Sequence, residues 1–87
     1  MADKELVGEI SHYYGQIDVA VIALDKELKV GDQVHIHGKN TDFVQEVKSM
    51  QIDHQTVEEG KAGEEVAIKI DVRVRKGDSV YKLTAEE

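Results

Sequence analysis

Apolar and polar residues alternate in short runs along most of this chain, which is the pattern of β-strands with one buried face. Such runs predict strands over residues 6–13, 17–24, 33–37, 43–52, 65–72 and 79–83. Short strands separated by frequent turns are typical of a small barrel or sandwich. The pattern therefore predicts an all-β fold, a small closed or partly open β-barrel of about six strands.

The alternation also predicts which side chains face the core. The clearest run places five residues on one face, Val66, Ile68, Ile70, Val72 and Val74. The same rule predicts two further inward sets, Val34 with Ile36, and Ile17 with Val19 and Val21. In the first of these sets the histidines at 35 and 37 point to solvent.

Two segments leave the pattern ambiguous. Residues 43–52 carry apolar side chains that one face of a regular strand cannot hold, and a β-bulge near 46–49 would reconcile them. Residues 20–30 contain good helix formers without an internal glycine, so a helix is the alternative there.

Three glycine turns, each introducing an apolar strand, are the most distinctive feature of the sequence. They are VGDQVHI at residues 30–36, AGEEVAIKI at 62–70 and KGDSVY at 76–81. In each, glycine can take a positive φ, and an acidic residue follows it before the strand. Their order, with SMQIDH at 49–54 between the first two, is more informative than any one turn.

This ordered series resembles domain two of the translation GTPases, the β-barrel that follows the nucleotide-binding domain in elongation factor Tu and initiation factor 2. A similar barrel occurs as a C-terminal module in the collagenase-like peptidase family. The resemblance implies a translation-protein barrel fold over nearly the whole chain and, by analogy with elongation factors, a role in binding transfer RNA. The chain departs from that family at residues 21–26, where the family carries an arginine-containing motif. No binding residue is therefore carried over from that motif.

Composition predicts one folded domain. The chain has 87 residues, of which 40% are hydrophobic and 33% charged, and a net charge of -7. We expect the barrel to span residues 6–83, with polar tails at 1–5 and 84–87. The acidic segment at 58–65 is expected to be a solvated connection, with a docking site for a basic partner as the alternative.

Location and cofactors follow from what the sequence lacks. It has no cysteine, no basic segment followed by an apolar stretch at its start, and no apolar run long enough to cross a membrane. We therefore expect a cytoplasmic protein that needs no membrane and no disulfide. No cofactor is expected.

The residues that carry common enzyme chemistry do not assemble in the sequence. Neither Gly38-Lys39 nor Gly60-Lys61 fits a phosphate loop, so nucleotide hydrolysis is excluded. Asp53 and His54 are adjacent, but neighbours in a strand face opposite sides, so they form a dyad only if a turn bends there. We expect no enzymatic activity.

His35 and His37 are the weak candidates for a metal site, because alternate residues of a strand share a face. No third ligand is assignable, so we expect no metal and treat both as solvated.

Positive charge is concentrated in a basic stripe, defined here as Lys69, Arg73, Arg75 and Lys76, with Tyr81 near it. On the outer face of one strand these residues would bind a few phosphates or an acidic partner, although an ordinary solvated face has the same composition. The expected function is a non-catalytic module that binds RNA or a ribonucleoprotein. The alternative is a protein-interaction module that docks on an RNA-modifying enzyme or a translation factor. Oligomeric state is left open.

Overall fold

The computed structural model describes residues 2–85, and within them the chain forms ten strands and no helix. The predicted all-β class is confirmed. The strands are β1 (Ala2–Tyr14), β2 (Val19–Leu24), β3 (Leu28–Lys29), β4 (Gln33–His37), β5 (Asp42–Glu46), β6 (Met50–Ile52), β7 (Gln55–Val57), β8 (Glu59–Gly60), β9 (Glu65–Lys69) and β10 (Ser79–Ala85).

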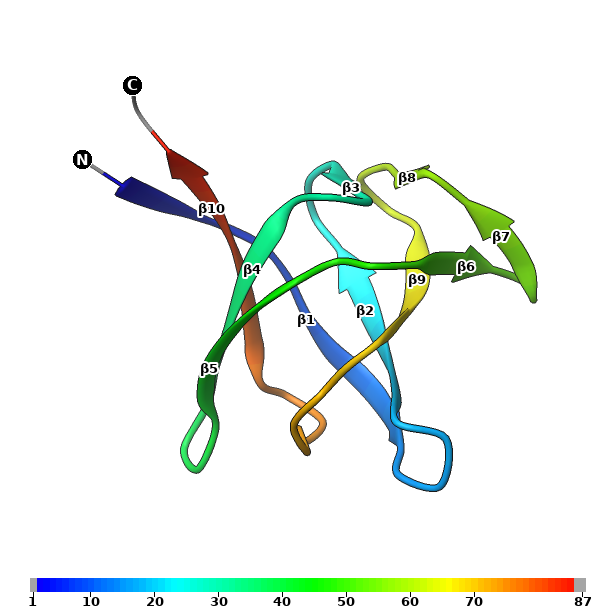
Figure 1. The fold of residues 1–87 in the computed structure, drawn as a ribbon, viewed down its shortest axis with the longest axis horizontal. Helices are drawn as coiled ribbons and strands as arrows, with labels where there is room; N and C mark the ends of the chain where they lie inside the picture. The colour runs from blue at the N-terminus through cyan, green and yellow to red at the C-terminus, as the bar shows by residue number, and fades with distance from the viewer. Residues whose placement is uncertain (1, 86–87) are drawn as a thin grey trace.

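Eight strands form one antiparallel sheet in the order β5-β4-β10-β1-β2-β9-β6-β7, and β3 pairs with β8 separately. Figure 1 shows the large sheet curling around an interior. The first part of β1 pairs with β10 and the last part with β2, so this long strand joins the two halves of the curl. Gly8 lies where the two ladders overlap, and a Cβ there would collide with the Ala23 carbonyl oxygen.

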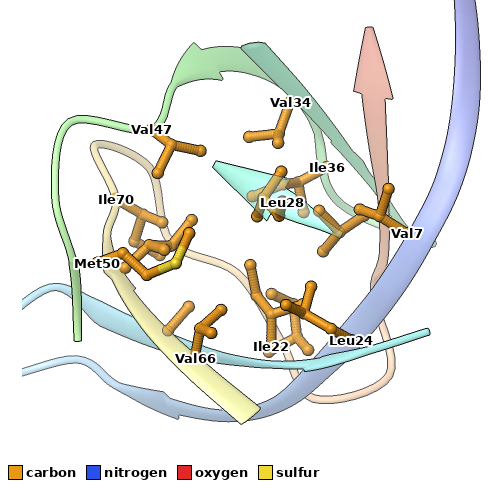
Figure 2. Packing of buried hydrophobic residues seen from close by; sticks show 14 of the residues in the cluster. Val7, Ile22, Leu24, Leu28, Val34, Ile36, Val47, Met50, Val66 and Ile70 are labelled. Atoms are coloured by element: carbon orange, nitrogen blue, oxygen red, sulfur yellow. The ribbon is translucent and has the colours of Figure 1, made fainter. Parts of the chain in front are cut away.

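The core lies inside this curl. Among residues 4–83, fifteen hydrophobic residues are buried, and the ten labelled in Figure 2 point from different strands, and from the links that hold Val47 and Ile70, toward a common centre. The buried set is Val7, Ile10, Ala20, Ile22, Leu24, Leu28, Val34, Ile36, Val47, Met50, Val66, Ile68, Ile70, Val74 and Val80. Burial of apolar surface on this scale is the main force that keeps the sheet curled around its core.

Two details of the predicted core were wrong. In β2 the inward residues are Ala20, Ile22 and Leu24, whereas Val19 and Val21 face outward and Ile17 is 59% exposed. Apolar residues occupy both faces of residues 17–24, so alternation could not select the inner one. The prediction that Val72 lies in the core was also wrong. Because β9 ends at Lys69 and the chain leaves the sheet there, the Val72 side chain is 47% exposed.

The ambiguous segments are also resolved. Residues 20–30 contain β2, a turn and β3, so the helix alternative was wrong. Residues 43–52 contain two strands, β5 and β6, that pair with different neighbours on either side of a link. The link, rather than a bulge inside one strand, allows Val47 to reach the core.

Gln45 ties the free edge of β5 to the other side of the curl. Its buried side-chain amide donates to the Lys69 carbonyl oxygen at 3.0 Å and accepts from the Asp71 amide at 2.9 Å. These are the two bonds that a neighbouring strand would make with its peptide groups. The Gln45 side chain therefore links β5 to the end of β9 and the segment after it by two hydrogen bonds, where β5 and β9 form no β-ladder.

Strands replace much of the predicted tails. Residues 2–5 pair with residues 82–85, from Ala2 opposite Ala85 to Glu5 opposite Lys82. Figure 1 shows these two strand ends side by side. Alternation is weak in these polar ends, and pairing with each other is what orders their backbone. Residues 1, 86 and 87 lie outside the described residues.

The three glycine turns are built alike. Gly31, Gly63 and Gly77 have φ of 98°, 90° and 96°. In each turn the acidic residue after the glycine accepts a hydrogen bond from the backbone amide three residues before it, with distances of 2.9, 2.7 and 2.9 Å. The same pairs are joined by a backbone hydrogen bond in the other direction. In each turn the glycine thus adopts the positive φ, and the acidic residue stabilises the turn by its hydrogen bonds.

Candidate functional site

The outer face of β1, β2, β9 and β6 is unexpectedly apolar. Directly paired residues of antiparallel strands share a face. Two rows of paired residues lie on this face: one joins His12, Val21, Ala67 and Gln51 across four strands, and the other joins Tyr14, Val19 and Lys69 across three. Their middle residues, Val19, Val21 and Ala67, are apolar and lie on the side away from the core together with Tyr14. An antiparallel sheet usually presents polar residues on its solvent face.

Apolar residues of this face form the floor of an open groove of about 420 Å³. Its apolar floor consists of Tyr14, Ile17, Val19, Val21 and Ala67. Its polar rim consists of Gln51, Asp53, His54 and Glu65. Hereafter "the groove" means these two sets of residues.

Two turns flank the groove, and both hold non-glycine residues in the left-handed region. Asp18, between β1 and β2, has a φ of 55°. Asp53 and His54, between β6 and β7, have φ of 52° and 66°. Ile52 pairs with Gln55, so Asp53 and His54 form a two-residue hairpin turn of type I′, in which Asn-Gly and Asp-Gly are preferred sequences. The groove is therefore bordered by conformations that glycine would adopt at lower cost.

A second cluster lies on the outer face formed by β1, β10, β4 and β5. Lys4 Nζ donates to His35 Nδ1 at 3.2 Å, and His35 Nε2 lies 2.5 Å from Asp42 Oδ1. Tyr81 packs beside them, with Lys4 Nζ 4.8 Å from its ring centre. The hydrogen bond from His35 is the main cause that lowers the pKa of Asp42 below its ordinary value, and the nearby positive groups act in the same direction.

The two candidate metal ligands lie in or beside this second cluster. The rings of His35 and His37 are 5.8 Å apart, as expected for alternate residues of β4. Within residues 2–85, however, no group of three histidine, aspartate or glutamate side chains could hold a metal ion. His35 instead bonds with Lys4 and Asp42.

The basic stripe does not form one strand face. Lys69 is the last residue of β9, whereas Arg73, Arg75 and Lys76 lie in the irregular connection to β10. All four are exposed. Tyr81, predicted to lie near them, instead packs against Lys4 and 6.2 Å from His35 between ring centres. The structure thus groups Tyr81 with the histidines.

Sequence reasoning missed the groove as a site. Its floor residues in 17–24 were assigned to the core, and Asp53 with His54 were considered only as a catalytic pair. Two signals were present in the sequence: more apolar residues in 17–24 than one strand face can bury, and an Asp-His pair where a tight turn bends the chain.

Comparison with known proteins places these features in context. No model of a known protein family matches the chain. It is 47% identical over 78 residues to an uncharacterised protease of Methanocaldococcus jannaschii, covering 88% of this chain and 19% of that protein. It is 30% identical over 86 residues to a collagenase of Porphyromonas gingivalis, covering 97% of this chain and 24% of the collagenase. The chain thus spans about a fifth to a quarter of the length of these relatives.

A solved structure has the same fold. The crystal structure of the C-terminal domain of a protein described as a U32 peptidase, from Geobacillus thermoleovorans, superposes with a TM-score of 0.84 at 16% identity. The match covers 90% of this chain and 91% of that domain. The chain is similar to the C-terminal domain of a U32 peptidase.

These findings correct the expected function. The relatives are named as a protease and a collagenase, and the matching structure comes from a peptidase, so the resemblance to the collagenase-like peptidase module is supported. The prediction of a translation-factor module that binds RNA was wrong, and so was its alternative of docking on a translation factor or an RNA-modifying enzyme. The glycine turns that suggested it specify a fold rather than that function. Among the described residues, no helix is long and apolar enough to cross a membrane.

Proposed function

We propose that this chain is a non-catalytic accessory domain that works with a peptidase of the U32 type and binds polypeptide for it. The observation that carries this proposal is the pair of matches to a protease and a collagenase. Each match takes in nearly all of this chain but less than a quarter of the relative. Most of each relative lies outside the matched part. A binding role for the matched part would leave cleavage to the remainder.

The side chains of the described residues support binding rather than cleavage. The hydrogen bonds of histidine side chains in residues 4–83 join His35 to Lys4 and Asp42, and Ser11 donates to the Val21 carbonyl oxygen. A serine- or cysteine-type nucleophile needs its hydroxyl or thiol within reach of a base; Ser11 instead bonds to a carbonyl oxygen, and the chain has no cysteine. The proposal includes a cytoplasmic location, which the absence of cysteine favours.

Domain replacement in the collagenase relative tests this proposal. The segment that matches this chain would be deleted from the Porphyromonas gingivalis protein, and in a second variant replaced by this chain. We expect deletion to raise KM for gelatin several-fold while hydrolysis of a short fluorogenic peptide continues, because a short peptide does not need an accessory binding surface. Replacement by this chain should restore the KM for gelatin.

The isolated 87-residue chain is the control, and it should cleave neither gelatin nor the short peptide. Cleavage by the isolated chain would show that it is itself catalytic. An unchanged KM for gelatin after deletion would show that the segment does not bind substrate.

A further inference from the structure

We propose that the groove binds an extended polypeptide segment in which an aliphatic side chain is next to a lysine or arginine. This inference rests on the proposed function, since it names the ligand and the residues that would recognise it. Four features of the groove support it: its floor, its size, the charge of its rim and the backbone of its flanking turns.

The floor provides an apolar contact surface that the fold itself does not use. Val19 and Val21 are half-buried on the side of β2 opposite the core, and Tyr14 and Ile17 are 48% and 59% exposed. Scattered exposed apolar residues are ordinary, but these lie on neighbouring parts of β1, β2 and the turn between them, continue to Ala67 in β9, and line one hollow. An aliphatic side chain that covers them would remove this apolar surface from water, which favours binding.

The size of the groove selects a short segment rather than a domain. Its volume of about 420 Å³ lies at the lower end of the range for small-ligand sites, which runs from about 300 to 1,000 Å³. Packing between domains instead buries about 600–1,500 Å² over a broad surface. A hollow of this kind accommodates one or two side chains of a chain that passes across it.

The rim supplies the preference for positive charge. Asp53 and Glu65 both line the groove, and neither lysine nor arginine does. Lys69 faces the same side opposite Val19 but is not part of the lining. The whole chain carries a net charge of -7. A lysine or arginine beside the aliphatic side chain would meet both carboxylates, whereas an acidic neighbour would be repelled.

The flanking turn indicates that the rim residues are kept for their side chains. Asp53 and His54 occupy the two left-handed positions of a type I′ turn; aspartate is among the residues preferred at the first, but glycine is preferred at the second, where His54 stands. Both side chains line the groove. Retaining functional side chains at strained positions is typical of ligand-binding sites, where the strain is offset by the rest of the structure.

Nuclear magnetic resonance titration of the isotope-labelled 87-residue chain tests this inference. The probes are two blocked tetrapeptides, Gly-Leu-Lys-Gly and Gly-Leu-Glu-Gly. We expect the lysine peptide to shift the resonances of Ile17, Val21, Ala67 and Asp53. We also expect it to bind about tenfold more tightly than the glutamate peptide.

Two variants and a matched control complete the test. Ile17→Ser removes an exposed apolar contact, and Ala67→Arg fills the floor and brings a positive charge; each should weaken binding of the lysine peptide at least about fivefold. Val72→Ser removes an exposed apolar residue outside the groove and should leave binding unchanged.

The inference is overturned if neither peptide shifts groove resonances at millimolar concentration, if the two peptides bind equally well, or if the shifts map elsewhere. Concentration-dependent shifts of the groove residues without peptide would also overturn it, because a second copy of the chain would then cover this face. All of these readouts use the chain alone. They are therefore independent of the domain replacement that tests the proposed function.

Discussion

Two groups of turns in this molecule solve the same backbone problem in different ways. The glycine turns at Gly31, Gly63 and Gly77 reach φ of 90–98° with the residue that tolerates it best. The turns beside the groove reach φ of 52–66° with aspartate and histidine at positions 18, 53 and 54.

The difference separates turns that build the fold from turns that border a site. In the glycine turns the carboxylate of the acidic residue accepts a hydrogen bond from a backbone amide of the same turn, so this side chain stabilises the fold. At Asp53 and His54 the side chains instead line the groove. The side chains of the first group therefore serve the fold, whereas those of Asp53 and His54 are available to the ligand that we propose for the groove.

The largest expected effect is at the third glycine turn. Asp78 is buried, and its carboxylate accepts the Arg75 amide, so Asp78→Ala leaves that donor without a partner. We expect a loss of about 1–3 kcal/mol in the free energy of unfolding, measured by urea denaturation. Asp32→Ala makes the same change at the first, more exposed turn and should cost less. Equal losses would show that burial does not distinguish the two turns.

The glycine itself should contribute less than the buried acid. A Cβ at Gly77 meets no atom within 4 Å, so Gly77→Ala tests the positive φ alone. We expect a loss of about 1 kcal/mol in the same denaturation experiment. Gly15→Ala, in a turn where φ is not positive, is the control; its Cβ would lie 3.3 Å from the Tyr13 ring, which must shift slightly, and the loss should be smaller than for Gly77→Ala. A neutral Gly77→Ala would contradict the role assigned to the glycine turns.

Beside the groove we expect a substitution to raise the free energy of unfolding rather than to lower it. Replacing both central residues of the β6–β7 turn, by Asp53→Asn with His54→Gly, introduces the preferred type I′ sequence. We expect the free energy of unfolding to rise by about 0.5–1 kcal/mol. A loss of stability would mean that the aspartate and histidine side chains stabilise the fold, and the contrast between the two groups of turns would disappear.

The smallest expected effect concerns Asp42, outside both groups of turns. Its pKa is lowered in the folded protein, chiefly by the hydrogen bond from His35. The contact therefore stabilises the fold above the carboxyl's unfolded pKa, about 3.9, and this contribution is lost as the pH falls through the lower folded pKa.

Urea denaturation of Asp42→Asn and the unmodified chain between about pH 6 and 2 measures this dependence. The gap between the two proteins should be small, since the carboxylate is exposed, and should close as the pH falls below about 4. A gap that widens on acidification would have the wrong sign.

Much of the fold could be predicted from local pattern. The alternation in residues 33–37 has apolar residues on one face only, and in residues 65–70 the large apolar residues share one face while the other carries only the small Ala67 between two charges, so Val34, Ile36, Val66 and Ile68 were placed correctly. The short strands β3, β7 and β8 were missed because they have two or three residues each and form through long-range pairing. The two hydrogen bonds of the Gln45 side chain could not be predicted either, because its partners, Lys69 and Asp71, lie 24 and 26 positions further along the chain.

The site was harder to predict than the fold, for a physical reason. Val19 and Val21 lie in a strand that is apolar on both faces, and hydrophobicity does not distinguish a core contact from a ligand contact. The prediction that the basic stripe lies on one strand face was also wrong. Its charges are close in sequence, but β9 ends at Lys69, before the other three residues of the stripe. The first error concerns which way a strand faces, and the second concerns where a strand ends. Both are decided by pairing with other strands, which the local sequence does not show.

Peptide affinity in the turn-optimised variant tests the central claim, that these left-handed residues are kept for binding. The Asp53→Asn, His54→Gly chain and the unmodified chain would be titrated with the blocked Gly-Leu-Lys-Gly peptide in samples whose unfolding free energies are also measured. We predict a more stable protein that binds the peptide several-fold more weakly, because the rim loses one carboxylate and the imidazole. Unchanged or tighter binding by the stabilised variant would contradict the account.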